Sequence, residues 1–248
     1  MTAVAIVSSG FVNAQISNGV EMTKGGRLGT VLGLFLVAVG LVVWAVASFL
    51  TPGVPGGVVN FVNAQAKGQP VNLTVETVGS IGFGAHPTWV SYLVKNPTTG
   101  KWLHDTSWQL PAHTLIHMTV YQYDSGSPLR NQEWGQVQGT VGGTATLNGK
   151  TFSVYNSNTG NGVGHTFAIP QFNLSVPMVG VIGSATLCGV APCHTSAPHN
   201  TETFSFMTPG PGSYNWQCFV PCALGYLYGN GGAMSTQNYM GGEVEVVQ

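Results

Sequence analysis

The stretch TFSFMTPGPGSYNWQCFVPC (residues 203–222) contains the pattern on which the fold of this chain depends. Two runs rich in aromatic and alternating apolar side chains, TETFSFM (201–207) and SYNWQCF (213–219), stand on either side of a Pro-Gly-Pro-Gly sequence. Runs of this kind predict β-strands, and Pro and Gly predict a turn between them. The second predicted strand ends near Cys218, and Cys222 follows with the spacing C-x3-C.

Similar short runs separated by turn residues continue on both sides of this stretch. They are VNLTVETV (71–78), TWVSYLVK (88–95), HTLIHMTVYQYD (113–124), GTATLN (143–148), KTFSVYN (150–156), HTFAIP (165–170) and GEVEVVQ (242–248). The pair Asn148-Gly149 between two of them is a strong hairpin signal, because a type I′ turn needs positive φ at both central residues. No segment after residue 50 has a convincing helical period. The predicted fold class is therefore all-β, a Greek-key sandwich or barrel.

One long apolar run lies near the start of the chain. LGTVLGLFLVAVGLVVWAVASFL (28–50) contains no charged residue, and Lys24 and Arg27 precede it. A helix rises about 1.5 Å per residue, so this run is long enough to cross a hydrocarbon core of about 30 Å. The basic residues before the run, with none after it until Lys67, predict a cytoplasmic N-terminus and an extracytoplasmic C-terminal part. A cleaved signal peptide, or a start at Met22, is the alternative.

These features divide the chain into four predicted parts. They are a cytoplasmic segment (1–27), a transmembrane helix (28–50), a linker rich in Pro, Gly and Val (51–70) and one exported domain (71–248). Charged residues make up only 6% of the chain and form no basic cluster, which excludes nucleic acid as a partner. A surface with so few titrating groups changes its charge little with pH and would suit an acidic exterior.

Three stretches carry a resemblance to a known family. GHTFAIPQFNLSVPMV (164–179) resembles the cupredoxin segment in which a His begins a strand that ends at a Pro-flanked bend. Residues 203–222 resemble the part that delivers a Cys to the copper loop, and YMGGEVEVVQ (239–248) resembles the terminal strand, which follows a Met. With its single predicted anchor, the chain resembles single-helix subunit II of haem-copper oxidases that use cytochrome c or quinol. It also resembles membrane-anchored blue copper proteins such as sulfocyanin.

The resemblance implies a copper site near the C-terminus. Subunit II holds dinuclear copper with a C-x3-C pair, an upstream His, a second His after the pair and a Met. Cys218 and Cys222 have this spacing, and His165 stands where the upstream His belongs. Met240 stands where the Met ligand precedes the final strand. Thiolate, imidazole and thioether donors suit copper. The implied copper ligands are therefore His165, Cys218, Cys222 and Met240.

The chain departs from the family motif after the C-x3-C pair. Tyr226 stands at the position of the second His, Gly229 stands at that of the Met, and no His follows Cys218. The resemblance thus implies a respiratory oxidase subunit that has a degenerate copper site and docks to integral-membrane oxidase subunits without being catalytic alone. Two alternatives stay open. One is a copper electron-transfer protein with an altered ligand set, and the other is a stand-alone exported envelope or adhesion module.

The four cysteines also allow a structural interpretation. Cys188, Cys193, Cys218 and Cys222 lie in the part predicted to be exported, where disulfides persist, and their even number favours bridges or a metal site over free thiols. Local pairs or a crossed pairing are both open, and each bridge would stabilise the domain by about 2–4 kcal/mol. A zinc site built from the cysteines and histidines of CGVAPCHTSAPH (188–199) is a further alternative, although its spacing is unlike that of common zinc sites.

The remaining candidate residues point to no independent enzyme. Trp216 lies two residues before Cys218, so both share one face of the strand, and this position suits an electron path to a metal. His113 and His117 share a strand face and are interpreted as partly exposed histidines. Neither a G-x-S-x-G elbow nor a metalloprotease His spacing occurs.

Overall fold

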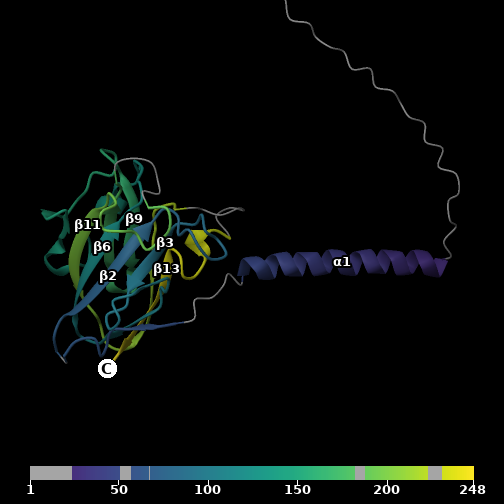
Figure 1. Cartoon of the computed structure of the whole chain (residues 1–248), viewed down its shortest axis with the longest axis horizontal. Coiled ribbons are helices and arrows are strands. Elements are labelled where there is room, and N and C mark those ends of the chain that lie inside the picture. The colour runs from purple at the N-terminus through teal and green to yellow at the C-terminus, as the bar shows by residue number, and fades with distance from the viewer. Residues whose placement is uncertain (1–23, 51–56, 67, 182–187, 223–230) are drawn as a thin grey trace, which may run out of the picture. The chain divides into compact units, whose positions relative to one another are not determined.

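The computed structural model describes residues 24–50, 57–66, 68–181, 188–222 and 231–248. The chain forms two compact units, Met1–Ala47 and Ser48–Gln248. The first contains most of the helix α1 (Lys24–Leu50), and the second contains a β-sandwich (Figure 1). Within α1, the span Gly25–Ala47 is long and apolar enough to cross a membrane, as a membrane anchor or as a signal sequence. The predicted apolar helix is confirmed, and its orientation in a membrane stays a prediction.

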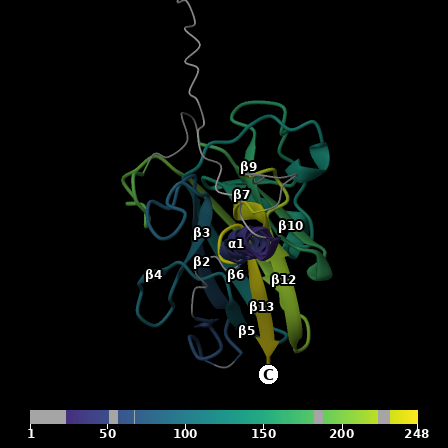
Figure 2. The same cartoon turned by 90° about the vertical axis from the view of Figure 1, so that its right-hand side faces the viewer.

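The described part of the second unit contains two sheets (Figures 1 and 2). The six-stranded sheet has the order β1 (Val59–Asn60), β5 (Trp108–Pro111), β13 (Gly241–Val247), β12 (Gly212–Gln217), β9 (Val163–Ile169) and β10 (Leu174–Val179). The seven-stranded sheet has the order β4 (Trp102–Leu103), β3 (Ser91–Lys95), β2 (Val71–Val78), β6 (Leu115–Gln122), β11 (Asn200–Met207), β7 (Ala145–Leu147) and β8 (Lys150–Phe152). Short 3-10 helices are η1 (Gln132–Gly135), η2 (Val141–Gly143), η3 (Pro170–Phe172) and η4 (Ala233–Ser235).

Side chains alternate between the core and solvent along several of these strands, because successive residues of a strand point to opposite faces. In β6, Ile116 and Met118 are buried while His117 between them is exposed. In β13, Val244 is buried and Glu243 is exposed. The predicted all-β fold class, with one N-terminal apolar helix, is therefore confirmed.

The stretch of residues 203–222 connects the two sheets. β11 pairs with β6 and β7 in one sheet, whereas β12 pairs with β13 and β9 in the other. The Pro-Gly-Pro-Gly sequence therefore turns the chain from one layer into the other. The second predicted turn is a true hairpin, because Asn148 and Gly149 join β7 and β8 with φ values of 49° and 81°.

The sandwich begins earlier than the sequence predicted. β1 (Val59–Asn60) lies inside the predicted linker (51–70) and pairs in parallel with β5. Val59 and Phe61 are both buried in the core, and the Asn60 side chain between them is exposed. Three residues of the predicted linker thus alternate as a strand does and cover the edge of the sheet.

A group of packed aromatic rings fills the core near the end of the sandwich that carries the predicted copper ligands. Trp108 and Trp216 lie on β5 and β12 with ring centroids 4.9 Å apart and 14° between planes. Phe167 of β9 lies 5.4 Å from Trp216, and Tyr92 of β3 lies 4.9 Å from it. All four are fully buried. These rings pack the two sheets together next to the predicted copper ligands.

Candidate metal centre

Three of the four predicted copper ligands come together at one end of the sandwich. His165 is the third residue of β9, Cys218 directly follows β12, and Cys222 comes after a short turn. β9 and β12 are neighbours in one sheet, which brings their side chains close. One ligand atom from each of these residues lies within 4.8 Å of the other two, and all three residues are buried.

The two thiols of this group are free. Their Sγ atoms are 3.4 Å apart, much longer than the disulfide bond length of about 2.05 Å. His165 Nδ1 lies 2.8 Å from Sγ of Cys222 and 4.0 Å from Sγ of Cys218. The pairing of Cys218 with Cys222, one of the predicted disulfides, is therefore not formed, because both side chains are turned toward the imidazole.

Backbone groups of β9 hold the thiols in place. The Thr166 N–H donates to Sγ of Cys218 at 3.4 Å, and Sγ of Cys222 lies 3.2 Å from the carbonyl oxygen of Gly164. The Thr166 hydroxyl accepts the N–H of Phe219 at 2.7 Å, which fixes the start of the turn between the cysteines. The strand that carries the imidazole thus also orders both sulfur atoms.

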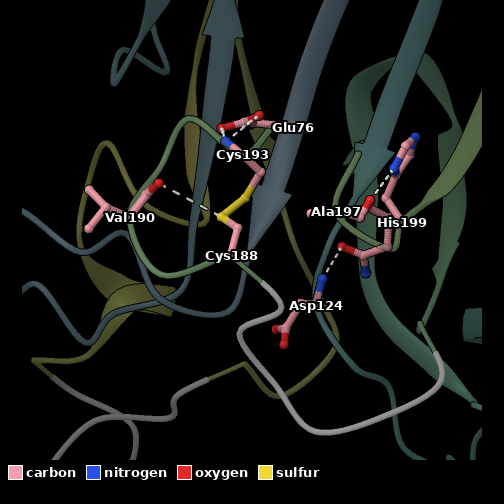
Figure 3. Close-up of a disulfide and its surroundings, with 8 residues drawn as sticks. Glu76, Asp124, Cys188, Val190, Cys193, Ala197 and His199 are labelled. Atoms are coloured by element: carbon pink, nitrogen blue, oxygen red, sulfur yellow. Dashed lines mark hydrogen bonds between the residues drawn. A yellow bond between two sulfur atoms is a disulfide. The ribbon is translucent and has the colours of Figure 1, made fainter. Parts of the chain in front are cut away.

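The other two cysteines form a disulfide, as predicted for a local pair. Cys188 and Cys193 are bonded, so neither thiol is available to zinc and the alternative zinc site in this segment is wrong. The disulfide closes a loop beside Glu76 of β2, and the Cys193 N–H donates to both carboxylate oxygens, at 3.2 and 3.3 Å (Figure 3). Burial raises the pKa of Glu76 to about 7, although the bond from Cys193 acts to lower it.

The imidazole and the two thiols titrate as a coupled group. Burial acts to lower the pKa of His165, but hydrogen bonds and charges of Asp124 and Cys218 outweigh it and raise the pKa to about 9. Burial acts to raise the pKa of Cys218, but hydrogen bonds from Cys222 and His165 and the charge of His165 hold it well below its usual value. The hydrogen bond to Cys218, together with burial, raises the pKa of Cys222. The charged forms of His165 and Cys218 therefore stabilise each other.

Asp124 completes this group, and sequence reasoning missed it. Its Oδ2 accepts from His165 Nε2 at 3.1 Å, although the two residues are 41 positions apart in the chain. Asp124 follows β6, and no motif or spacing links it to the C-x3-C pair. The segment after β6 bridges to the other sheet, Ser125 to Val181 and Ser127 to Val163 of β9, and this tertiary pairing brings the carboxylate to the ring.

Met240 contacts the centre through its backbone. Its carbonyl oxygen accepts the N–H of Cys218 at 2.8 Å, and its side chain is fully buried. A ligand role for its thioether stays a prediction. Tyr226 and Gly229, which stand at the remaining family positions, lie outside the described residues.

The donor set fits a copper ion held by three protein groups. Two thiols and an imidazole nitrogen are soft and borderline donors, which suit copper in both oxidation states. They converge on one point, and the second imidazole nitrogen is already bonded to a carboxylate, as is usual for a metal-binding histidine. The full dinuclear set of subunit II is not present among the described residues.

A pocket of about 300 Å³ opens beside the centre. Its lining includes His165 and Cys222 together with Asp124, Thr88 and Val220. A larger pocket of about 490 Å³ lies over β12 and β13 and is lined mainly by polar side chains, with none of the three donors among them. Of these two pockets, only the smaller one therefore gives access to the donor group.

The predicted aromatic contact with the centre is present but indirect. Tyr92 lies between the two, with its ring 6.3 Å from that of His165 and 4.9 Å from that of Trp216. The Tyr92 hydroxyl donates to the carbonyl oxygen of Thr166 at 3.2 Å, and Trp216 Nε1–H donates to that of Thr106 at 2.9 Å. Trp216 therefore lies one ring away from His165, and Tyr92 is the ring that connects them.

Comparison with known proteins gives a likeness in fold only. No family model matches the chain, and no curated protein matches its sequence. A variant of rusticyanin, a cupredoxin, is 16% identical with a TM-score of 0.33, and the match covers 83% of this chain and 91% of that one. Rusticyanin from Thiobacillus ferrooxidans is 15% identical with a TM-score of 0.28, covering 83% and 92%. A laccase from Pediococcus acidilactici is 12% identical with a TM-score of 0.31, covering 78% and 30%. Sequence identities and TM-scores this low say nothing about what the site binds.

Proposed function

We propose that the β-sandwich is a copper-binding electron-transfer domain whose ligands include His165, Cys218 and Cys222. The observation that carries this proposal is the convergence of three buried donors, with both thiols free. Cys188 and Cys193 of the same domain are joined in a disulfide. The free thiol pair beside the imidazole therefore distinguishes this end of the fold from the loop that the disulfide closes.

The chain's own groups supply the metal donors and a series of ring contacts beside them. A metal would bind the thiolate and neutral imidazole forms of these groups, so binding would release to solvent the protons that they hold and would strengthen as pH rises. A copper ion held there would carry one electron at a time by changing between two oxidation states. Tyr92, Trp216 and Trp108 extend a series of ring contacts from His165 into the core, which supports electron transfer.

Metal analysis of the full chain in detergent micelles tests the proposal. We expect stoichiometric copper and a visible thiolate-to-copper absorption band, both lost in His165→Gln, Cys218→Ser and Cys222→Ser. His117→Gln is the matched control, because His117 is an exposed strand residue bonded to Ser205. Copper that is absent, or that is retained in all three ligand variants, would overturn the proposal. Zinc in place of copper would also overturn it, because zinc has no redox chemistry.

A role as a subunit of a respiratory haem-copper oxidase is the second candidate. The layout of one apolar helix ahead of a β-sandwich supports it, together with the departures from the copper motif in the sequence. In this role the helix anchors the chain in the cell membrane, the sandwich is extracytoplasmic, and integral-membrane oxidase subunits are the partners. Purification from native membranes tests it. Oxidase subunits that stay bound would support this role, whereas a chain that purifies alone and without copper would favour the envelope or adhesion module.

A further inference from the structure

We propose that Asp124 is a positioning residue of the metal centre, which fixes the His165 ring so that Nδ1 is the nitrogen presented to the two thiols. This inference rests on the proposed copper site. It adds a residue that the chain's copper-like motif does not contain, and it assigns the ligand nitrogen of His165.

The hydrogen bonds of the ring determine which nitrogen is free. Nε2 lies 3.1 Å from Asp124 Oδ2, and Nδ1 lies 2.8 Å from Sγ of Cys222. A neutral imidazole carries one N–H and one lone pair, and a carboxylate accepts the N–H. In the neutral ring, the form that binds a metal, donating Nε2–H to Asp124 leaves the lone pair on Nδ1, which points to the sulfur atoms. Rotation of the ring would leave the carboxylate without this donor.

Backbone contacts fix the carboxylate in turn. Asp124 Oδ1 accepts the N–H of Ser125 at 2.7 Å, and the Asp124 carbonyl oxygen accepts the N–H of Val181 at 2.9 Å. The side chain is only 13% exposed, and no other carboxylate among the described residues is within hydrogen-bonding distance of His165. The orientation of Asp124 is therefore set before any metal binds.

A glycine on the neighbouring strand makes room for this arrangement. Gly79 directly follows β2, and a Cβ added there would lie 2.5 Å from Asp124 Oδ1 and 2.9 Å from its Cγ. Carbon atoms do not approach this closely, so an alanine would push the carboxylate away from its position. Gly79 is distant in sequence from the ligands. A substitution there should change the orientation of the His165 ring while Asp124 is still present.

Copper affinity of the full chain in detergent micelles, measured against a competing copper chelator, tests the inference. Asp124→Asn keeps the volume of the side chain. The Ser125 N–H, which donates to Asp124 Oδ1, should hold the amide oxygen of the variant, so that its NH2 group faces His165 Nε2, where an acceptor is needed. We expect its affinity for Cu(I) to fall about 10–100-fold, the usual effect of losing such a partner. The visible thiolate-to-copper absorption band of the oxidised, Cu(II) form should shift as well. Gly79→Ala should lower the affinity in the same direction with Asp124 still present.

Asp105→Asn is the matched control. Asp105 is a buried aspartate that accepts the N–H of Ser107 at 3.1 Å, and it has no bond to His165. Its variant should bind copper with wild-type affinity. If Asp124→Asn unfolds no more easily than Asp105→Asn and also keeps wild-type affinity and absorption, the inference is overturned. A loss of thermal stability without any change of affinity or absorption would show that Asp124 is structural only.

A metal-free readout separates this inference from the proposed function. In the chain labelled with 15N-histidine, the Nε2 proton of His165 should exchange slowly because it is bonded to Asp124, and the His165→Gln variant assigns the signal. The signal should disappear in Asp124→Asn. A wild-type chain that shows this proton but binds no copper refutes the function and leaves the ring orientation standing. If the proton is equally protected in Asp124→Asn, the positioning role fails whatever metal binds.

Discussion

Replacing Glu76 with Gln should abolish a large pH dependence of folding stability. Glu76 lies on β2 with no solvent exposure, and both of its carboxylate oxygens accept the N–H of Cys193 in the disulfide loop (Figure 3). Burial raises its pKa from 4.5 to about 7, against the smaller opposing effect of that hydrogen bond. The folded chain therefore keeps a proton that the unfolded chain releases.

The sign and size of the effect follow from this difference. Below pH 4.5 both states are protonated, and the carboxyl contributes no pH dependence. Between pH 4.5 and pH 7 the folded state binds more protons, so stability falls as pH rises, by about 1.4 kcal/mol per pH unit. The total loss is about 3 kcal/mol and is complete above pH 7. A glutamine does not titrate, so Glu76→Gln should gain about 3 kcal/mol over the wild type between pH 4 and pH 8.

Thermal unfolding of the full chain in micelles, at intervals from pH 4 to pH 8, measures this effect. For a domain of this size the gain corresponds to a Tm difference of about 10 °C that is present at pH 8 and absent at pH 4. Glu243→Gln is the control, because Glu243 is exposed on β13 and its carboxylate accepts a hydrogen bond from the hydroxyl of Ser213. Curves of wild type and Glu76→Gln that run parallel over the whole range would refute the reasoning.

Three further variants test the packing of the sandwich by denaturant unfolding. Removing the disulfide with Cys188→Ser and Cys193→Ser should cost about 2 kcal/mol, because the bridge closes a loop of only five residues, and unchanged stability would contradict this. Trp216→Phe should cost about 1–3 kcal/mol, since it leaves a cavity and removes the bond to the carbonyl oxygen of Thr106; a smaller loss would mean that the core repacks. Gly242→Ala should cost about 1–3 kcal/mol, because its Cβ would lie 1.9 Å from that same oxygen; a neutral result would show that β13 can shift.

The strand pattern was largely readable from the sequence, because a strand half buried in a sandwich needs alternating side chains. β2 has the predicted bounds, and the Asn148-Gly149 turn lies where positive φ was expected. The strands that were missed are short or lack alternation. β1 and β4 have two residues each, and β10 contains Pro177 and is buried at nearly every position.

The metal centre was predictable only where its residues are close in sequence or match a motif. His165, Cys218 and Cys222 were found in this way, and the structure brings them within reach of one another. Whether two cysteines form a disulfide depends on the separation of their sulfur atoms, which composition and spacing do not determine. The same spacing rules that correctly suggested the Cys188–Cys193 bridge also suggested one between Cys218 and Cys222.

The amino-acid sequence by itself determined the all-β class and the apolar helix, because these depend on local periodicity and residue chemistry. The three donor residues were proposed from their resemblance to a known motif. The tertiary structure alone decided that the donors converge with free thiols, and that Asp124 and Gly79 complete the site. These two residues follow different strands of the seven-stranded sheet, whereas His165 belongs to the other sheet. Their contact arises only when the two layers pack, and such long-range contacts leave no periodic or spacing signal along the chain.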